Sequence, residues 1–320
     1  MARRLSSGAI AKAFIGAGLL AVLVWQVDGA KVWALLRGAD LALFGAATLS
    51  VGIGLAGQAA RWAVIAAVLT PPLGLRNALV GVLEGQFVNQ IMPAMIGGDA
   101  VRALRAYDSG AEPGRAILGV ILDRALGLLF VAVIVVATIT LSRSPVVGSP
   151  SFRIIAVVAA IVVAGAAAVA LIGPLIVTLG LPRWFAPLAS VIDGFARVVR
   201  SPKAMVAMCG ATAVTTCGLA GGIALCGKAI GVALAPVDAI VVLTGMVIAG
   251  ALPLSIGGWG LREGATVLLL TSAGIDAAAA TSLAILFGLA LTALGLVGAI
   301  VWVLAGYRRF DRSAGLSKLR

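Results

Sequence analysis

Long uninterrupted apolar stretches dominate this chain and limit its fold more than any other feature. A helix needs about 20 predominantly apolar residues to cross a bilayer. Stretches of about that size recur along the whole chain, at residues 13–30, 41–69, 116–141, 153–180, 204–227 and 277–306. Only 11% of the 320 residues are charged, against about 25% in a soluble domain. The sequence therefore predicts one integral membrane domain over 1–320, an all-α polytopic fold.

Shorter apolar segments lie between these stretches. Segments 78–96 and 238–256 are each interrupted by proline and a glycine pair, and 264–274 is too short to cross alone. Basic residues lie in the loops on both sides of 78–96, which by the positive-inside rule places both loops in the cytoplasm. We therefore expect about six transmembrane helices and two re-entrant helical hairpins, a form that membranes tolerate where protein or water lines it. Eight crossings remain the alternative.

The distribution of charge orients the chain. The net charge is +12, and basic residues flank both the first and the last apolar stretch. Such flanks are typical of cytoplasmic ends held against anionic lipid rather than of a nucleic-acid-binding face. Both termini are therefore expected in the cytoplasm.

The absence of histidine excludes several kinds of chemistry. With no histidine in the chain, a Ser-His-Asp triad, a histidine proton shuttle and a histidine metal site are ruled out. The three cysteines, Cys209, Cys217 and Cys226, share one apolar stretch, where thiols behave as small hydrophobic groups. We expect no metal, no cofactor and no enzymatic activity.

A ten-residue motif occurs twice, 160 positions apart. Residues 93–102 read PAMIGGDAVR and residues 253–262 read PLSIGGWGLR, with five identical positions. Three expected crossings separate the copies, and an odd number inverts the second relative to the first. The sequence thus predicts inverted repeats over approximately 41–141 and 204–306. Repeats of this kind, with helices interrupted by glycine and proline at matching positions, are typical of secondary transporters.

Each copy of the motif supplies groups suited to an anion. Proline ends a helix, and a glycine pair lets a ligand approach the backbone. A helix that restarts after the pair presents free N–H groups, and an arginine in its first turn can bind phosphate through two hydrogen bonds. The candidate substrate-binding residues are Gly97, Gly98, Asp99, Arg102, Gly257, Gly258, Arg262 and Glu263. The alternative is that each arginine only pairs with a nearby carboxylate or extends to a head group.

Other polar side chains interrupt the apolar stretches, and ionisable residues there indicate a functional site by default. The expected charge network comprises Glu84, Asn89, Asp123 and Arg124, joined by Asp99 and Glu263. A competing interpretation is a structural ion pair, either of Asp123 with Arg124 or of Arg124 with Glu84.

Arg61 and Trp62 interrupt another apolar stretch. Because arginine and tryptophan both favour the depth of the membrane interface, we expect this pair to anchor its helix there.

The ordered motifs resemble a known family. They are Arg61-Trp62, Pro93…Gly97-Gly98-Asp99…Arg102, Leu122-Asp123-Arg124…Gly127-Leu128 and Pro253…Gly257-Gly258…Arg262-Glu263. With them the chain resembles the flippase-like family, also called the lysylphosphatidylglycerol synthase transmembrane-region family. The resemblance covers nearly the whole chain and implies a bacterial or archaeal inner-membrane protein that moves lipids, or helps to move them, between leaflets. Relatives that synthesise the lipid carry a soluble aminoacyl-transferase domain; this chain stops at Arg320 without one, so we expect no synthase activity.

The residues and the resemblance favour the same function. We expect a flippase that moves an anionic, phosphate-bearing lipid between leaflets of the bacterial inner membrane, by alternating access between the two hairpins. Membrane lipids are the expected partners, and nucleic acid is not; a lipid-pathway enzyme or a second copy of the chain are further candidates. The alternative function is a non-catalytic partner of a glycosyltransferase or another lipid-modifying enzyme. A membrane enzyme is disfavoured because the short, histidine-free loops offer few acid-base groups.

Overall fold

The computed structural model describes residues 28–69, 73–92, 96–141, 144–178, 186–251 and 260–316. Within these ranges all the regular structure is α-helical, which confirms the expected fold class. The helices are α2 (Gly29–Arg37), α3 (Leu41–Leu69), α4 (Leu75–Ile91), α5 (Ile96–Asp108), α6 (Pro113–Leu141), α7 (Pro145–Gly148), α8 (Pro150–Thr178), α9 (Ala186–Arg200), α10 (Pro202–Ala229), α11 (Pro236–Ala251), α12 (Leu261–Ser272) and α13 (Ala277–Leu316).

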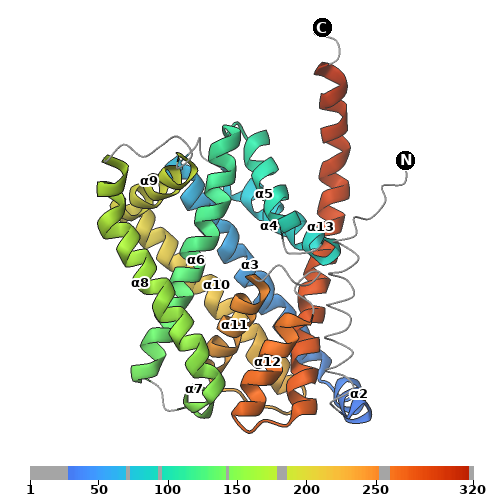
Figure 1. Ribbon diagram of the computed structural model, residues 1–320. Helices are drawn as coiled ribbons and strands as arrows, with labels where there is room; N and C mark the ends of the chain where they lie inside the picture. The colour runs from blue at the N-terminus through green and yellow to red at the C-terminus, as the bar shows by residue number, and fades with distance from the viewer. Residues whose placement is uncertain are drawn as a thin grey trace, which may run out of the picture.

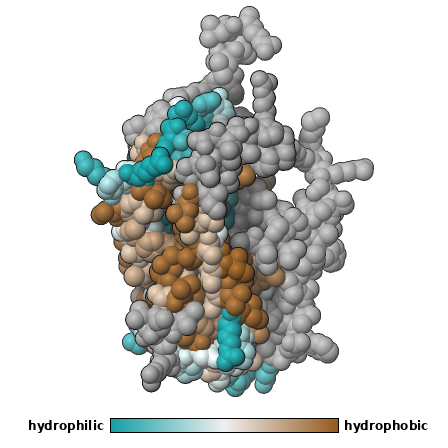
Figure 2. Space-filling view, turned by 60° about the vertical axis from the view of Figure 1, so that its left-hand side comes forward, coloured by the Kyte–Doolittle hydropathy of each residue, from teal (hydrophilic) through white to brown (hydrophobic). Residues whose placement is uncertain are grey.

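Five of these helices are long and apolar enough to cross a membrane. Their apolar segments are Leu41–Leu69, Pro113–Thr138, Pro150–Val169, Pro202–Ala229 and Ala277–Leu304, and each coincides with a stretch expected from the sequence. The sixth expected stretch, 13–30, lies almost entirely outside the described residues. On the face shown in Figure 2, apolar side chains form a broad band between hydrophilic residues near the two ends.

The helices of the expected hairpins are too short to cross alone. α4 and α5 have 17 and 13 residues, and α11 and α12 have 16 and 12, against about 20 for a crossing. That they enter the bilayer as re-entrant hairpins stays a prediction.

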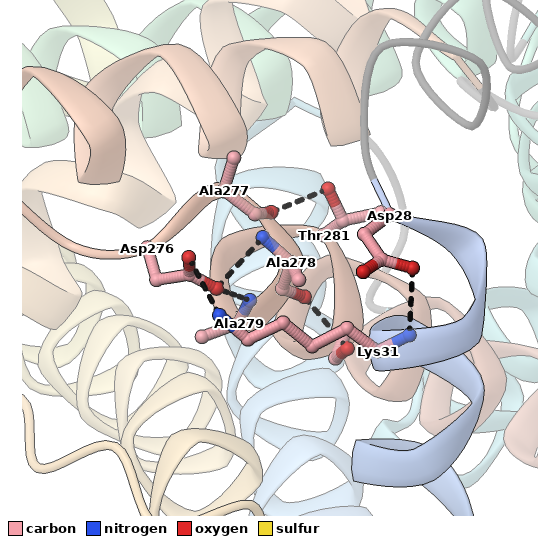
Figure 3. Close-up of polar contacts among 8 residues, drawn as sticks. Asp28, Lys31, Asp276, Ala277, Ala278, Ala279 and Thr281 are labelled. Carbon is pink, nitrogen blue, oxygen red and sulfur yellow. Dashed lines mark hydrogen bonds and ion pairs between the residues drawn. The ribbon is translucent and has the colours of Figure 1, made fainter.

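Aspartates at helix starts explain where several elements begin. Asp40 accepts hydrogen bonds from the backbone N–H groups of the first turn of α3, and Asp28 does the same for α2. Asp276 accepts from Ala278 N and Ala279 N, both at 3.1 Å. Such caps satisfy N–H groups that have no partner inside the helix. Figure 3 shows the cap of α13, where Lys31 Nζ also donates to Asp276 at 3.0 Å.

Contacts between helix ends define two faces of the bundle. Asp40 N donates to Ala229 O at 2.9 Å, which joins the start of α3 to the end of α10 at what we call the Ala229 face. Arg115 Nη1 donates to Leu69 O at 3.2 Å, which joins the end of α3 to the start of α6 at the opposite, Leu69 face. The α4–α5 hairpin begins and ends at the Leu69 face, and the α11–α12 hairpin begins and ends at the Ala229 face (Figure 1).

An antiparallel crossing of α3 and α10 forms the centre of the bundle. A Cβ atom on Gly218 would lie 2.5 Å from the backbone N of Gly54, and one on Gly57 would lie 2.7 Å from the backbone N of Thr215. Glycine is therefore required for the two backbones to approach this closely, as is common where membrane helices pack.

The order and lengths of the helices recur along the chain. α3, α4, α5 and α6 have 29, 17, 13 and 29 residues, and α10, α11, α12 and α13 have 28, 16, 12 and 40. Because α3 and α10 are antiparallel, this order agrees with the inverted repeats expected over 41–141 and 204–306. The repeats themselves stay a prediction.

Candidate functional site

Asp123 lies at the centre of a cluster of charged side chains inside the bundle. Its carboxylate, fully buried in α6, accepts from Arg61 Nε of α3 at 2.7 Å and from Arg102 Nη2 of α5 at 2.5 Å. Arg102 Nη1 also lies 3.6 Å from Asp99 Oδ1, and Arg124 Nε pairs with the other oxygen of Asp99. These five side chains, three cations and two anions from α3, α5 and α6, form what we call the Asp123 cluster.

Tight packing holds the buried arginines in place. The guanidinium of Arg102 lies 4.6 Å from the centre of the Trp62 ring, a cation–π contact. A Cβ atom on Gly127 would lie 2.8 Å from Nη2 of Arg61, so the guanidinium packs directly against the backbone of α6 at this glycine. Both arginine side chains are less than 10% exposed. The inner part of the cluster is therefore desolvated.

The outer edge of the cluster reaches the surface. The side chain of Arg124 is 43% exposed and that of Asp99 is 24% exposed, whereas the side chain of Asp123 is fully buried. The cluster thus runs from an accessible ion pair to a buried one.

A second ion pair lies one turn along α5. Arg105 Nη2 donates to Glu84 Oε1 of α4, and Glu84 is 1% exposed. Four buried polar atoms nearby have no protein partner among the described residues: Trp62 Nε1, Glu84 Oε2, Arg102 Nε and Arg105 Nε. Buried polar atoms of this kind are usually satisfied by water or by a ligand.

The first glycine pair serves helix packing instead of a turn. α5 already begins at Ile96, so Gly97 and Gly98 lie inside its first turn, which corrects the expectation that the helix restarts after them. A Cβ atom on Gly98 would lie 2.6 Å from Gly85 O of α4. Gly98 N donates to Asn89 Oδ1 at 2.8 Å, so one N–H expected to bind an anion already has a protein acceptor.

The described part of the second motif forms a pair at the start of α12, the inner end of the α11–α12 hairpin. Arg262 donates to Glu263 Oε1 through Nε at 3.0 Å and through Nη2 at 2.5 Å, and Gly260 N donates to Oε2 at 2.7 Å. Arg262 and Glu263 are 7% and 1% exposed. Pro253, Gly257 and Gly258 lie outside the described residues. The described residues of the two motifs therefore belong to different hairpins, Arg102 to the α4–α5 hairpin and Arg262 to the α11–α12 hairpin (Figure 1).

The structure shows neither of the two ion pairs considered from the sequence, Asp123 with Arg124 or Arg124 with Glu84. Asp123 lies between Arg61 and Arg102, Arg124 pairs with Asp99, and Glu84 pairs with Arg105. Neighbouring residues on a helix point about 100° apart, so the side chains of Asp123 and Arg124 project from α6 in different directions.

Arg61 and Trp62 are not interfacial anchors, so that expectation is wrong. They are 7% and 0% exposed, because each serves the Asp123 cluster. Sequence reasoning also missed that Arg105, whose side chain is 14% exposed, pairs with the buried Glu84. One signal was present in the sequence: Arg105 follows Arg102 by three positions, and such residues share a helix face.

The chain also matches a known family of membrane regions. The family model described as the lysylphosphatidylglycerol synthase TM region matches residues 9–310. The chain belongs to this family. Comparison with curated proteins gives no match. The Asp123 cluster thus lies within the transmembrane region that defines the lysylphosphatidylglycerol synthase TM family.

Proposed function

We propose that the chain moves an anionic, phosphate-bearing lipid between the leaflets of a bacterial inner membrane. The observation that carries the proposal is the Asp123 cluster, which extends from an exposed ion pair to a fully buried carboxylate within a membrane-spanning bundle. Ionisable residues are costly at such depth and commonly mark a substrate path. Membership of the lysylphosphatidylglycerol synthase TM family supports a role with membrane lipids.

Arg124 is the residue that a lipid phosphate would meet first. Its side chain is 43% exposed, whereas that of Arg102 is 4% exposed and is held by Asp123. In our proposal the phosphate displaces Asp99 from Arg124, and Asp99 is then released to turn more fully towards Arg102. Charge-assisted hydrogen bonds to phosphate replace those to the carboxylate, so the exchange costs little.

The second motif would receive the head group at the other leaflet. Arg262 and Glu263 form the corresponding buried pair at the inner end of the α11–α12 hairpin, which begins and ends at the Ala229 face. Alternating access would then arise from movement of the α4–α5 hairpin at one face and the α11–α12 hairpin at the other, as inverted repeats favour.

The orientation follows from basic residues at the Leu69 face. Arg76, Arg197, Arg200 and Lys203 lie in loops or helix ends there, and α13 runs towards the same face with further basic residues after it. By the positive-inside rule we assign the Leu69 face and both termini to the cytoplasm.

A second function is favoured by the pairing of the arginines. Arg102 and Arg262 both already bind carboxylates, as expected if the ion pairs are purely structural. A chain of that kind would be a non-catalytic membrane partner of a glycosyltransferase or another lipid-modifying enzyme. In either case we propose that the chain itself is not an enzyme.

Leaflet exchange in liposomes tests the two functions. Labelled anionic and zwitterionic lipids would be followed in liposomes containing the purified full chain or its variants. We expect Arg124→Gln to slow exchange of the anionic lipid about tenfold, the effect of losing a charge-assisted hydrogen bond, and Arg102→Lys and Arg262→Lys to slow it as well. Arg153→Gln is the matched control, since Arg153 is exposed on α8 and contributes nothing to the Asp123 cluster.

The outcomes separate the proposals. Exchange that depends on Arg124 but not on Arg153 supports the flippase. Folded wild-type protein that gives no exchange above empty liposomes overturns it and favours the partner function.

A further inference from the structure

A cavity of about 490 Å³ lies between the first turns of α6 and the helix α9, away from the Asp123 cluster. Its walls are apolar side chains from α3, α6 and α9, namely Leu69, Ile117, Leu118, Ile121 and Val191. Ile117 and Ile121 are 54% and 45% exposed, so the apolar wall is open at the surface. Gly114 also lines the cavity, and a Cβ atom there would meet nothing within 4 Å.

The rim of the cavity carries two charges of each sign. Glu112 immediately precedes α6 and Arg115 lies in its first turn, with Arg115 Nε 3.6 Å from Glu112 Oε2. Asp193 and Arg197 come from α9, with Arg197 Nη2 2.7 Å from Asp193 Oδ2. All four side chains are more than half exposed. The ion pairs themselves can rearrange towards a ligand at little cost, because exposed ion pairs contribute little stability. Arg115 also donates to Leu69 O through Nη1 at 3.2 Å, which keeps its guanidinium at the cavity.

The cavity lies at the boundary of the membrane-spanning segment. The segment of α6 that can span the bilayer begins at Pro113, so Glu112 and Arg115 lie at its end while Ile117 and Ile121 lie within it. The charged rim of the cavity therefore lies at the depth of lipid head groups, and its apolar walls lie at the depth of acyl chains.

We propose that this cavity binds one phospholipid whose zwitterionic head group carries a free amine, such as a phosphoethanolamine lipid. The phosphate would accept hydrogen bonds from Arg115 and Arg197, and the ammonium would donate to Glu112 and Asp193. The inference goes beyond the proposed transport, since neither Asp123 nor Arg124 lines the cavity.

The balance of charge selects this head group over others. An anionic lipid would bring a phosphate to the two arginines but leave both carboxylates without a cation. A trimethylammonium head group has no N–H and could not donate to the carboxylates. The apolar wall accommodates one acyl chain, whose burial contributes about 0.8 kcal/mol per CH₂.

Native mass spectrometry of the purified full chain tests the proposal. Delipidated protein would be titrated with dioleoyl-phosphatidylethanolamine, -phosphatidylcholine and -phosphatidylglycerol in separate experiments. We expect the ethanolamine lipid to bind most tightly, and Arg197→Gln and Asp193→Asn each to weaken it about threefold to tenfold, somewhat less than for a buried charged hydrogen bond because the groups are exposed. Ile121→Trp, which fills the apolar wall, should weaken all three lipids.

Matched controls come from the same elements. Arg200→Gln removes an exposed charge from α9 outside the cavity, and Ile154→Trp enlarges an exposed apolar side chain on α8; neither should change lipid binding. Thermal unfolding of each variant confirms that it is folded. Equal affinity for the ethanolamine and choline lipids, tightest binding of the glycerol lipid, or equal losses in Arg197→Gln and Arg200→Gln would each overturn the proposal. Leaflet exchange is measured for the same cavity variants. Because they retain Arg124, loss of lipid binding at the cavity can be distinguished from loss of the proposed transport.

Discussion

At the scale of single residues, Asp123 shows how one side chain orders several elements. Its carboxylate accepts from Arg61 and Arg102, so it connects α3 and α5 through α6. Both arginines lose hydration on folding, and the carboxylate of Asp123 is the acceptor that they share. The contact therefore maintains the arrangement of helices rather than adding net stability, since burying an ion pair is itself costly.

Removing the charge of Asp123 should be strongly destabilising. In Asp123→Asn the buried guanidinium of Arg61 loses its ion pair, and that of Arg102 keeps only the longer contact with Asp99. We expect the free energy of unfolding to fall by about 3–5 kcal/mol. SDS titration in mixed micelles measures that change. Glu112→Gln is the control, because Glu112 belongs to an exposed pair whose loss should change stability by at most about 1 kcal/mol. Similar effects for the two variants would contradict a buried role for Asp123.

The ion pair of Asp276 with Lys31 predicts a dependence of stability on pH. The hydrogen bond from Lys31 and then that from the backbone N–H of Ala279 lower the pKa of Asp276 below its usual value of 3.8. A folded-state pKa below the unfolded one contributes stability that is complete above the unfolded pKa and is lost as pH falls through the folded pKa. The wild-type chain should therefore exceed Asp276→Asn in Tm near neutral pH, and the difference should shrink below about pH 4.

Asparagine also caps helices well, so this comparison isolates the charge on Asp276. Thermal unfolding of both proteins at a series of pH values provides the measurement, and Lys31→Gln serves as the partner control. A Tm difference that stays constant down to about pH 2 would argue against the ion pair as its cause.

At the scale of elements, the crossing of α3 and α10 depends on positions that lack a side chain. Gly218 lies against the backbone of Gly54 and 2.8 Å from Ser50 O, measured from the position of its missing Cβ. Neither neighbour is a flexible side chain that could move away. The two helices would have to separate to accept a methyl group.

Gly218→Ala should therefore loosen the centre of the bundle. We expect a loss of about 1–3 kcal/mol, the usual cost of overpacking, seen as a lower Tm in detergent. Gly210→Ala is the matched control on the same helix, because a Cβ atom there meets nothing within 4 Å. Its effect should be neutral or slightly stabilising, since alanine favours helix more than glycine does. Equal losses in the two variants would show that the crossing tolerates a side chain.

At the scale of the whole molecule, the two hairpins lie at opposite faces of one bundle. α5 ends at the Leu69 face, and the loop between α10 and α11 lies at the Ala229 face. If the chain spans the bilayer as we propose, the end of α5 is accessible from one side of the membrane and the loop between α10 and α11 from the other.

Single cysteines test this arrangement after Cys209, Cys217 and Cys226 have been replaced by alanine. Tyr107 and Ala233 are exposed at the Leu69 and Ala229 faces. An impermeant maleimide added to intact cells should label Ala233→Cys and leave Tyr107→Cys unlabelled until the membrane is opened. Labelling of both cysteines from outside would contradict the arrangement.

The positions of the long helices could be predicted from the sequence because they depend on local composition. The limits of the apolar stretches 41–69, 204–227 and 277–306 predicted α3, α10 and α13 within a few residues, except that α13 continues to Leu316. A membrane crossing requires a minimum number of consecutive apolar residues. Each segment can be tested for this without knowledge of the rest of the chain. Four residues of the Asp123 cluster, Asp99, Arg102, Asp123 and Arg124, were likewise named as candidates from the sequence, because charge is unusual in apolar surroundings.

Which residues form pairs was decided only by the tertiary structure. Asp123 contacts Arg61, which is 62 positions away in the chain, and it points away from its neighbour Arg124 because successive helical side chains diverge. Arg61 resembled an interfacial anchor until α6 brought Asp123 beside it. Sequence determined how many residues each helix contains and which of them are charged. The packing of α3, α5 and α6 decided which charges neutralise each other, because a buried charge is stabilised by whichever counterion lies close in space rather than along the chain.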